Sequence, residues 1–67
     1  MTVCVNGEPR ELEDATTVAD VVQSLVEQAE RGMAVALDGE VVPRSEWEST
    51  TLRDGAHLEV LRAVQGG

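Results

Sequence analysis

Apolar and polar residues alternate in the opening stretch MTVCV, whose odd-numbered residues form one apolar face. This period of two is typical of a β-strand with one buried side. Asn6 and Gly7 follow, and this dipeptide favours a tight hairpin turn because both residues accept a positive φ. A second strand is therefore predicted over residues 8–12. Pro9 lies within it and lacks a backbone N–H, so we expect this strand at a sheet edge or at a strand start.

The stretch TTVADVVQSLVEQAERG has a helical period instead. Its apolar residues recur at i, i+3, i+4, i+7, i+8 and i+11, forming the stripe Val18, Val21, Val22, Leu25, Val26 and Ala29. Thr17 is the predicted N-cap, and Asp20 lies in the first turn, near the positive end of the helix dipole. Arg31 is expected in the last turn, and Gly32 at the left-handed C-cap. Valine has weak helix propensity, so this helix depends on packing against other elements.

The middle of the chain predicts two further strands. MAVAL forms the third strand, the Asp-Gly pair at 38–39 forms a turn, and a short fourth strand ends at Pro43. Ser45 is expected to cap a single helical turn that contains Trp47. An indole is large and mostly apolar, so we interpret Trp47 as a lid on one end of the core rather than as a ligand-stacking residue.

The last predicted strand is AHLEVLRAV, entered through the Asp-Gly turn at 54–55. Alternation places Leu58 and Val60 on one face, and Glu59, Leu61 and Ala63 on the other. One helix covers one face of a sheet, so Leu61 is left exposed beside the end of the chain. Isolated exposed apolar residues are common, but an apolar cluster leading into a terminus, here Leu61 with Val64, favours a docking surface.

The element order is β-β-α-β-β-β, which predicts an α+β fold with one helix layered on a mostly antiparallel sheet of four to five strands. The helix is long enough to cross over the sheet, so the strands on either side of it need not pair. A parallel contact between the first and last strands is compatible with this order, but the pattern alone does not establish it.

Size and charge restrict the function. Sixty-seven residues make one domain, 1–67, with a core too small for a broad catalytic cleft. The net charge is −8, which argues against nucleic acid and anionic membranes as partners; acidity favours either a basic protein partner or simply solubility. No signal segment or membrane-length apolar run is present, so a cytoplasmic location is expected.

Candidate catalytic chemistry is sparse. All five basic residues are Arg and none is Lys, so the chain offers no side-chain amine for an isopeptide bond. Cys4 is the single cysteine, and we interpret it as a small strand residue. His57 is the single histidine and has no titratable neighbour in sequence, so we interpret it as a solvated strand residue rather than a general base. No nucleophile triad, acid–base pair or metal set is evident, so activity as an enzyme is not expected.

The sequence finishes on Gly66 and Gly67, after Val64 and Gln65. Glycine passes where a side chain would clash, and the five residues 63–67 extend up to ~17 Å. A frayed chain end with no function would show the same two glycines. The functional interpretation is a flexible tail that threads a terminal carboxylate into a partner's active site. ATP converts such a carboxylate into an acyl-adenylate, and a sulfur donor displaces AMP to leave a thiocarboxylate.

These features resemble the ThiS family, the ubiquitin-like sulfur carriers of thiamin (thiazole) biosynthesis. The likeness extends over the opening strand, "NGE", the helix, "LRDGAHLEVLRAV" and the final "GG". The family pattern "NGEVVPRSEW" is present as "DGEVVPRSEW", with Asp38 replacing Asn and keeping the turn chemistry. The resemblance implies a β-grasp fold whose first and last strands pair in parallel at the sheet centre.

The resemblance also implies a mechanism. A ThiF-like adenylating enzyme would activate Gly67 with ATP, and the resulting thiocarboxylate would deliver sulfur to a ThiG-like thiazole synthase. No permanently bound cofactor or metal is implied. Gly66, Gln65 and Val64 correspond to the threading tail, and Leu61 and Ala63 to the docking strand.

Three alternatives compete with this reading. One is the small subunit of molybdopterin synthase, although that family usually runs longer and carries bulky aromatics, whereas this chain has no Phe or Tyr. Another is a sulfur carrier for a different metabolite. The third, from another class, is a binding module or a protein modifier whose tail forms amide bonds to lysines.

Overall fold

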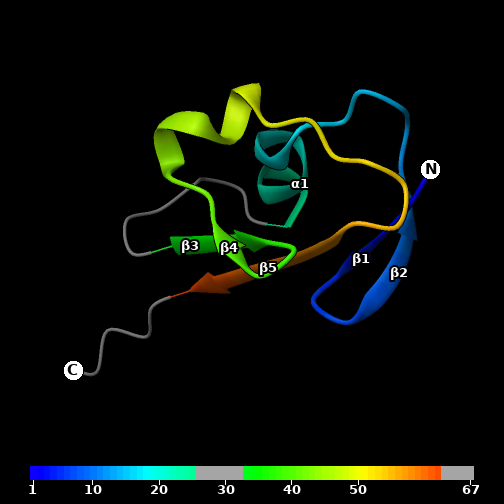
Figure 1. Ribbon diagram of the computed structural model, residues 1–67, viewed down its shortest axis with the longest axis horizontal. Helices are drawn as coiled ribbons and strands as arrows, with labels where there is room; N and C mark the ends of the chain where they lie inside the picture. The colour runs from blue at the N-terminus through cyan, green and yellow to red at the C-terminus, as the bar shows by residue number, and fades with distance from the viewer. Residues whose placement is uncertain (26–32, 63–67) are drawn as a thin grey trace.

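The computed structural model describes residues 1–25 and 33–62, and within them a mixed sheet is covered on one face by helices (Figure 1). The elements in chain order are β1 (Thr2–Val5), β2 (Glu8–Glu11), α1 (Val18–Leu25), β3 (Met33–Leu37), β4 (Glu40–Val41), the 3-10 helix η1 (Arg44–Ser49) and β5 (His57–Arg62). In the part of the chain that is described, no helix is long and apolar enough to cross a membrane.

The sheet contains five strands in the order β2-β1-β5-β3-β4, so the last strand of the chain lies at its centre. β5 pairs in parallel with β1, where Cys4 lies opposite His57 and Val5 opposite Leu58. All other neighbouring pairs are antiparallel. This parallel contact is the pairing that the residue pattern left open and that the family resemblance implied.

Both predicted hairpins are present, and each turns on a residue in the left-handed region. Asn6 has a φ of 51° and Asp38 a φ of 50°, and each is followed by a glycine with a φ near 85° (84° at Gly7, 86° at Gly39). This is the backbone of a tight hairpin turn that matches the twist of its strands. β2 lies at the sheet edge, as Pro9 predicted, because an edge strand leaves one row of N–H groups unpaired.

Helix α1 begins where the sequence predicts. The Thr17 N–H donates to Asp20 Oδ2 at 3.0 Å, and the Asp20 N–H donates to Thr17 Oγ1 at 3.2 Å. This reciprocal pair satisfies backbone donors that the first turn leaves without helical partners, as in a capping box. The predicted C-cap region, Arg31 and Gly32, lies outside the described residues.

The core lies between α1, η1 and the inner face of the sheet (Figure 1). Its buried side chains are Val3, Val5, Val18, Val21, Val22, Val35, Trp47, Leu52, Ala56 and Leu58. Valine predominates, so the interior is built from small, stiff side chains, with one large indole at the side of η1.

The capping prediction for Ser45 is wrong. η1 runs over six residues and begins at Arg44, two residues earlier than a helix capped by Ser45 would, with Pro43 in the N-cap position. The Glu46 N–H donates to the Pro43 carbonyl at 2.8 Å, and within the described chain no side chain caps this first turn. The fixed φ of proline favours a helix start, so Pro43 both ends the fourth strand and begins η1, and Ser45 lies inside the helix.

Trp47 is buried, as predicted for a lid on the core, with 4% of its surface exposed. Its indole N–H donates to the Val42 carbonyl at 2.8 Å, which satisfies the polar atom of an otherwise apolar ring. This bond ties η1 back to the residue that follows β4. The Arg44 guanidinium also lies over the indole ring, 5.8 Å from its centre, which is within the range of a cation–π contact.

Candidate functional site

β5 carries the residues that the sequence connects with function, and the structure confirms their faces. Leu58 is buried at 1% exposure, and Val60 is half-buried against the core. Glu59 and Leu61 point to the outer face, where Leu61 is 58% exposed. Ala63, the other predicted docking residue, lies outside the described residues.

The outer face holds an apolar group larger than the sequence predicted. Leu61 lies opposite Ala34 on β3, and Ala36 on the same face of β3 lies opposite Val41 on β4. Directly opposed residues share a face of a sheet, so these four side chains form one surface across three strands, here termed the outer apolar patch. Val41 is 75% exposed, and with Leu61 it is one of two large exposed hydrophobic residues among those described.

Sequence reasoning missed Val41, Ala34 and Ala36 as members of this surface. Alternation within each short strand shows which residues share a face, but which strands are neighbours depends on tertiary pairing. The register Ala34↔Leu61 and Ala36↔Val41 brings them together. Apolar surface that gathers across neighbouring strands is the kind that binds a partner protein.

The charged residue next to the outer apolar patch on β5 is acidic. Glu59 lies opposite Ala36, directly beside the outer apolar patch, and is exposed. The whole chain has a net charge of −8. Complementary charge guides association, so the surface best matches a partner with an apolar centre and basic residues at its rim.

Cys4 and His57 lie opposite each other on the same outer face, toward β2. The Cys4 thiol is free and half-buried, and the His57 side chain is exposed. Over residues 1–25 and 33–62, no group of three or more His, Cys, Asp or Glu side chains is placed to hold a metal ion. The predicted interpretation of both as strand residues agrees with their positions in β1 and β5.

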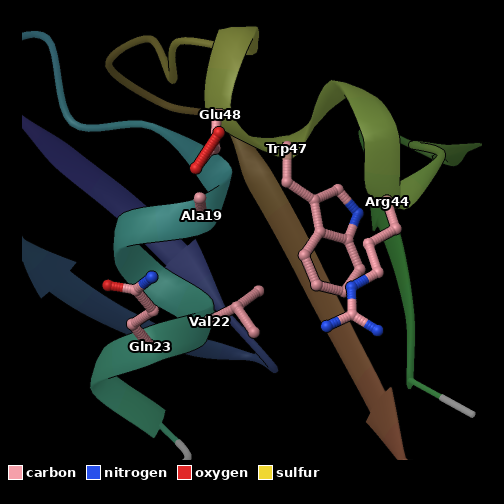
Figure 2. Close-up of a pocket in the computed structure, with 6 residues that line it drawn as sticks. All are labelled: Ala19, Val22, Gln23, Arg44, Trp47 and Glu48. Carbon is pink, nitrogen blue, oxygen red and sulfur yellow. The ribbon is translucent and has the colours of Figure 1, made fainter. Parts of the chain in front are cut away.

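A separate hollow lies on the helical side of the molecule, between α1 and η1 (Figure 2). Its volume is about 190 Å³, and its lining consists of Ala19, Val22, Gln23, Arg44, Trp47 and Glu48. Figure 2 shows Val22 pointing from α1 toward the indole, with the Arg44 guanidinium alongside the ring. Ligand pockets are typically larger, at about 300–1,000 Å³, so we interpret this hollow as a packing groove between two helices.

The predicted tail residues Val64, Gln65, Gly66 and Gly67 lie outside the described residues, so their role stays a prediction. β5, the strand that leads into them, is at the centre of the sheet with β1 and β3 on either side. The chain therefore enters its last five residues directly from the most extensively paired strand.

A mixed sheet with a central parallel pair, crossed on one face by a helix, defines the class of β-grasp domains. The model of the ThiS family matches residues 3–67, and the chain belongs to this family.

Individual relatives agree with this assignment. The chain is 25% identical, over the full length of both sequences, to the sulfur carrier protein ThiS of Escherichia coli strain K12. A crystal structure of the thiamine biosynthesis protein ThiS from Geobacter metallireducens is 31% identical, with a TM-score of 0.80 and full coverage of both chains. A solution structure of a thiamine biosynthesis protein from the same organism gives a TM-score of 0.74 and covers 100% of this chain and 88% of that one.

Proposed function

We propose that this protein is a sulfur carrier for thiamin biosynthesis, a co-substrate of other enzymes rather than an enzyme. Support comes from its membership of the ThiS family and from its likeness to the E. coli sulfur carrier along the entire chain. Residues 1–67 would act as one carrier domain, with 63–67 as its tail, and it would work in the cytoplasm. The observation that best supports the proposal is the central strand β5, which contributes Leu61 to the outer apolar patch and precedes Gly66 and Gly67 in the sequence.

The chemistry takes place at the Gly67 carboxylate. One carboxylate oxygen attacks the α-phosphorus of ATP and pyrophosphate leaves, which gives a mixed anhydride with AMP. A sulfur donor at the oxidation level of sulfide then attacks the carbonyl carbon, the bond to AMP breaks, and the new C–S bond leaves a thiocarboxylate on Gly67. The ThiF-like adenylating partner would bind and use the ATP. The thiocarboxylate would then donate its sulfur to a ThiG-like thiazole synthase.

Mass spectrometry of the intact chain tests this proposal. The chain is incubated with its cognate adenylating enzyme, ATP and a sulfide source, and the expected mass gain equals the difference between sulfur and oxygen. A chain lacking Gly67 is the control and should show no gain. Amide adducts between the chain and lysines of other proteins would instead support a protein modifier, and no ATP-dependent change in the wild-type chain would refute the carrier function.

Leu61→Asp is expected to weaken binding to the adenylating partner at least about tenfold in Kd, because it places a charge in the centre of an apolar contact. The side chain is 58% exposed, so the free energy of unfolding should fall by no more than about 1 kcal/mol. Titration calorimetry and chemical denaturation measure the two effects separately.

Gln23→Glu is the control for charge, because it also adds one negative charge but lies on α1, on the other side of the sheet. Its affinity for the partner should stay within about twofold of wild type, since an exposed charge far from a contact is screened by salt. Equal weakening by both variants would mean that net charge, and not the outer apolar patch, governs binding.

A further inference from the structure

Asn6 makes a contact that its role in a hairpin turn does not require. Its side-chain Oδ1 accepts a hydrogen bond from the Val60 N–H at 2.8 Å, across 54 residues of chain. Its own backbone N–H donates to the Leu58 carbonyl at 2.9 Å. One residue at the tip of the first hairpin therefore holds two residues of the central strand β5.

The position of this contact follows from where β1 ends. β1 runs over Thr2–Val5, and its parallel pairing with β5 includes Val5 opposite Leu58. Beyond that pair the chain turns back into β2, so no β1 carbonyl continues the ladder among the described residues. The Asn6 carboxamide takes the place of that carbonyl and extends the ladder as far as Val60, two residues before β5 ends at Arg62.

Asp38 makes the equivalent contact at the other end of β5. Its Oδ1 accepts from the His57 N–H at 2.9 Å, and its N–H donates to the His57 carbonyl at 2.8 Å. Both turn residues have a φ near 50° and precede a glycine. Asp38 thus holds the start of the strand, whereas Asn6 holds the half that leads to the tail.

We propose that Asn6 is a positioning residue for the reaction at Gly67, an inference that rests on the proposed carrier function. Its bond to Val60 fixes the β1 side of the strand segment 60–62, from which residues 63–67 depart. The orientation of that segment sets the point and direction from which a partner receives residues 63–67, which span up to ~17 Å when extended. A preorganised exit direction reduces the ordering that a partner must impose when it accepts the tail, and so it strengthens productive binding.

Two glycine substitutions test the proposal as a matched pair. Asn6→Gly and Asp38→Gly each keep the positive φ and create a Gly-Gly turn, and each removes one side-chain acceptor from β5. In amide hydrogen exchange, Asn6→Gly should speed exchange at Val60 roughly fivefold to tenfold, the factor expected from one lost hydrogen bond, without speeding exchange at His57 to the same degree. Asp38→Gly should give the reverse.

The functional readout is adenylation by the cognate enzyme, followed as ATP–pyrophosphate exchange. We expect Asn6→Gly to raise the KM for the carrier about fivefold with kcat unchanged, because binding is weakened equally in ground and transition states. Asp38→Gly should leave KM within about twofold of wild type after correction for the folded fraction. Asn6→Asp keeps an acceptor and tolerates the left-handed backbone, so it should restore the wild-type KM.

The outcomes are distinguishable. If Val60 exchange in Asn6→Gly matches wild type, or if both glycine variants raise KM equally, the positioning role is wrong while the carrier function stands. If the wild-type chain itself supports no exchange of pyrophosphate, the proposed function fails, and the positioning role fails with it. Rescue by Asn6→Asp together with a KM effect confined to Asn6→Gly would establish the role.

Discussion

Replacing Gly66 with valine should abolish most activation of the chain while leaving its fold intact. A β-branched side chain next to Gly67 is expected to lower kcat/KM for adenylation by about 100-fold, because small displacements of a reacting group cost rates of that order. The free energy of unfolding should stay within about 0.5 kcal/mol of wild type, since every buried core residue described lies between Val3 and Leu58. Pyrophosphate exchange and urea denaturation provide the two measurements.

Gln65→Val is the matched control for Gly66→Val. It introduces the same side chain one residue upstream, where a side chain is already present, so kcat/KM should fall by no more than several-fold. Unchanged activation in Gly66→Val would show that no narrow channel surrounds the penultimate residue. A parallel loss of stability and activity would show instead that Gly66 belongs to the folded core.

Trp47→Ala should destabilise the fold more than any exposed substitution. Truncating a buried Trp costs about 3–5 kcal/mol, whereas a domain of this size has a total stability of roughly 3–10 kcal/mol. Trp47 is 4% exposed and connects η1 to Val42 through its indole N–H. We therefore expect the melting temperature, measured by circular dichroism, to fall by at least about 15 °C.

Two further variants separate the contributions of the buried ring and of its hydrogen bond to this loss of stability. Trp47→Phe keeps an apolar ring but leaves the Val42 carbonyl without its indole donor, so its loss of stability should be intermediate, near about 1–3 kcal/mol. Val41→Ala removes apolar atoms from a side chain that is 75% exposed and should change stability by less than about 0.5 kcal/mol. A Trp47→Ala chain that melts within about 5 °C of wild type would contradict a role for the indole in the core.

Local features of the chain were predicted well because their causes are local. Asn6-Gly7 and the Asp-Gly pair at 38–39 impose hairpin turns through their own backbone preferences, and both turns are present. Thr17 and Asp20 begin α1 through contacts made three residues apart. The exception is Ser45, which was predicted to cap η1. Pro43 occupies the N-cap position instead, because its fixed φ favours a helix start, and η1 therefore begins earlier in the chain.

The candidate site was predicted only in part, because it is assembled from distant segments. Alternation within β5 placed Leu61 on the outer face, as observed. It carried no information that β3 and β4 would add Ala34, Ala36 and Val41 to the same surface, because the register between strands is a tertiary property. The Asn6–Val60 bond was likewise not predicted, since it joins residues 54 positions apart.

The sequence alone thus determines the hydrophobic periodicity, the turn dipeptides and the two final glycines, because each depends on the conformational preferences of a few adjacent residues. Which strands become neighbours depends on how α1 and η1 cover the sheet and bury the valine-rich core. That packing placed β5 between β1 and β3, and it thereby created the outer apolar patch and the side-chain contact ahead of the tail. Contacts between segments far apart in sequence are selected by burial, which no short stretch encodes alone.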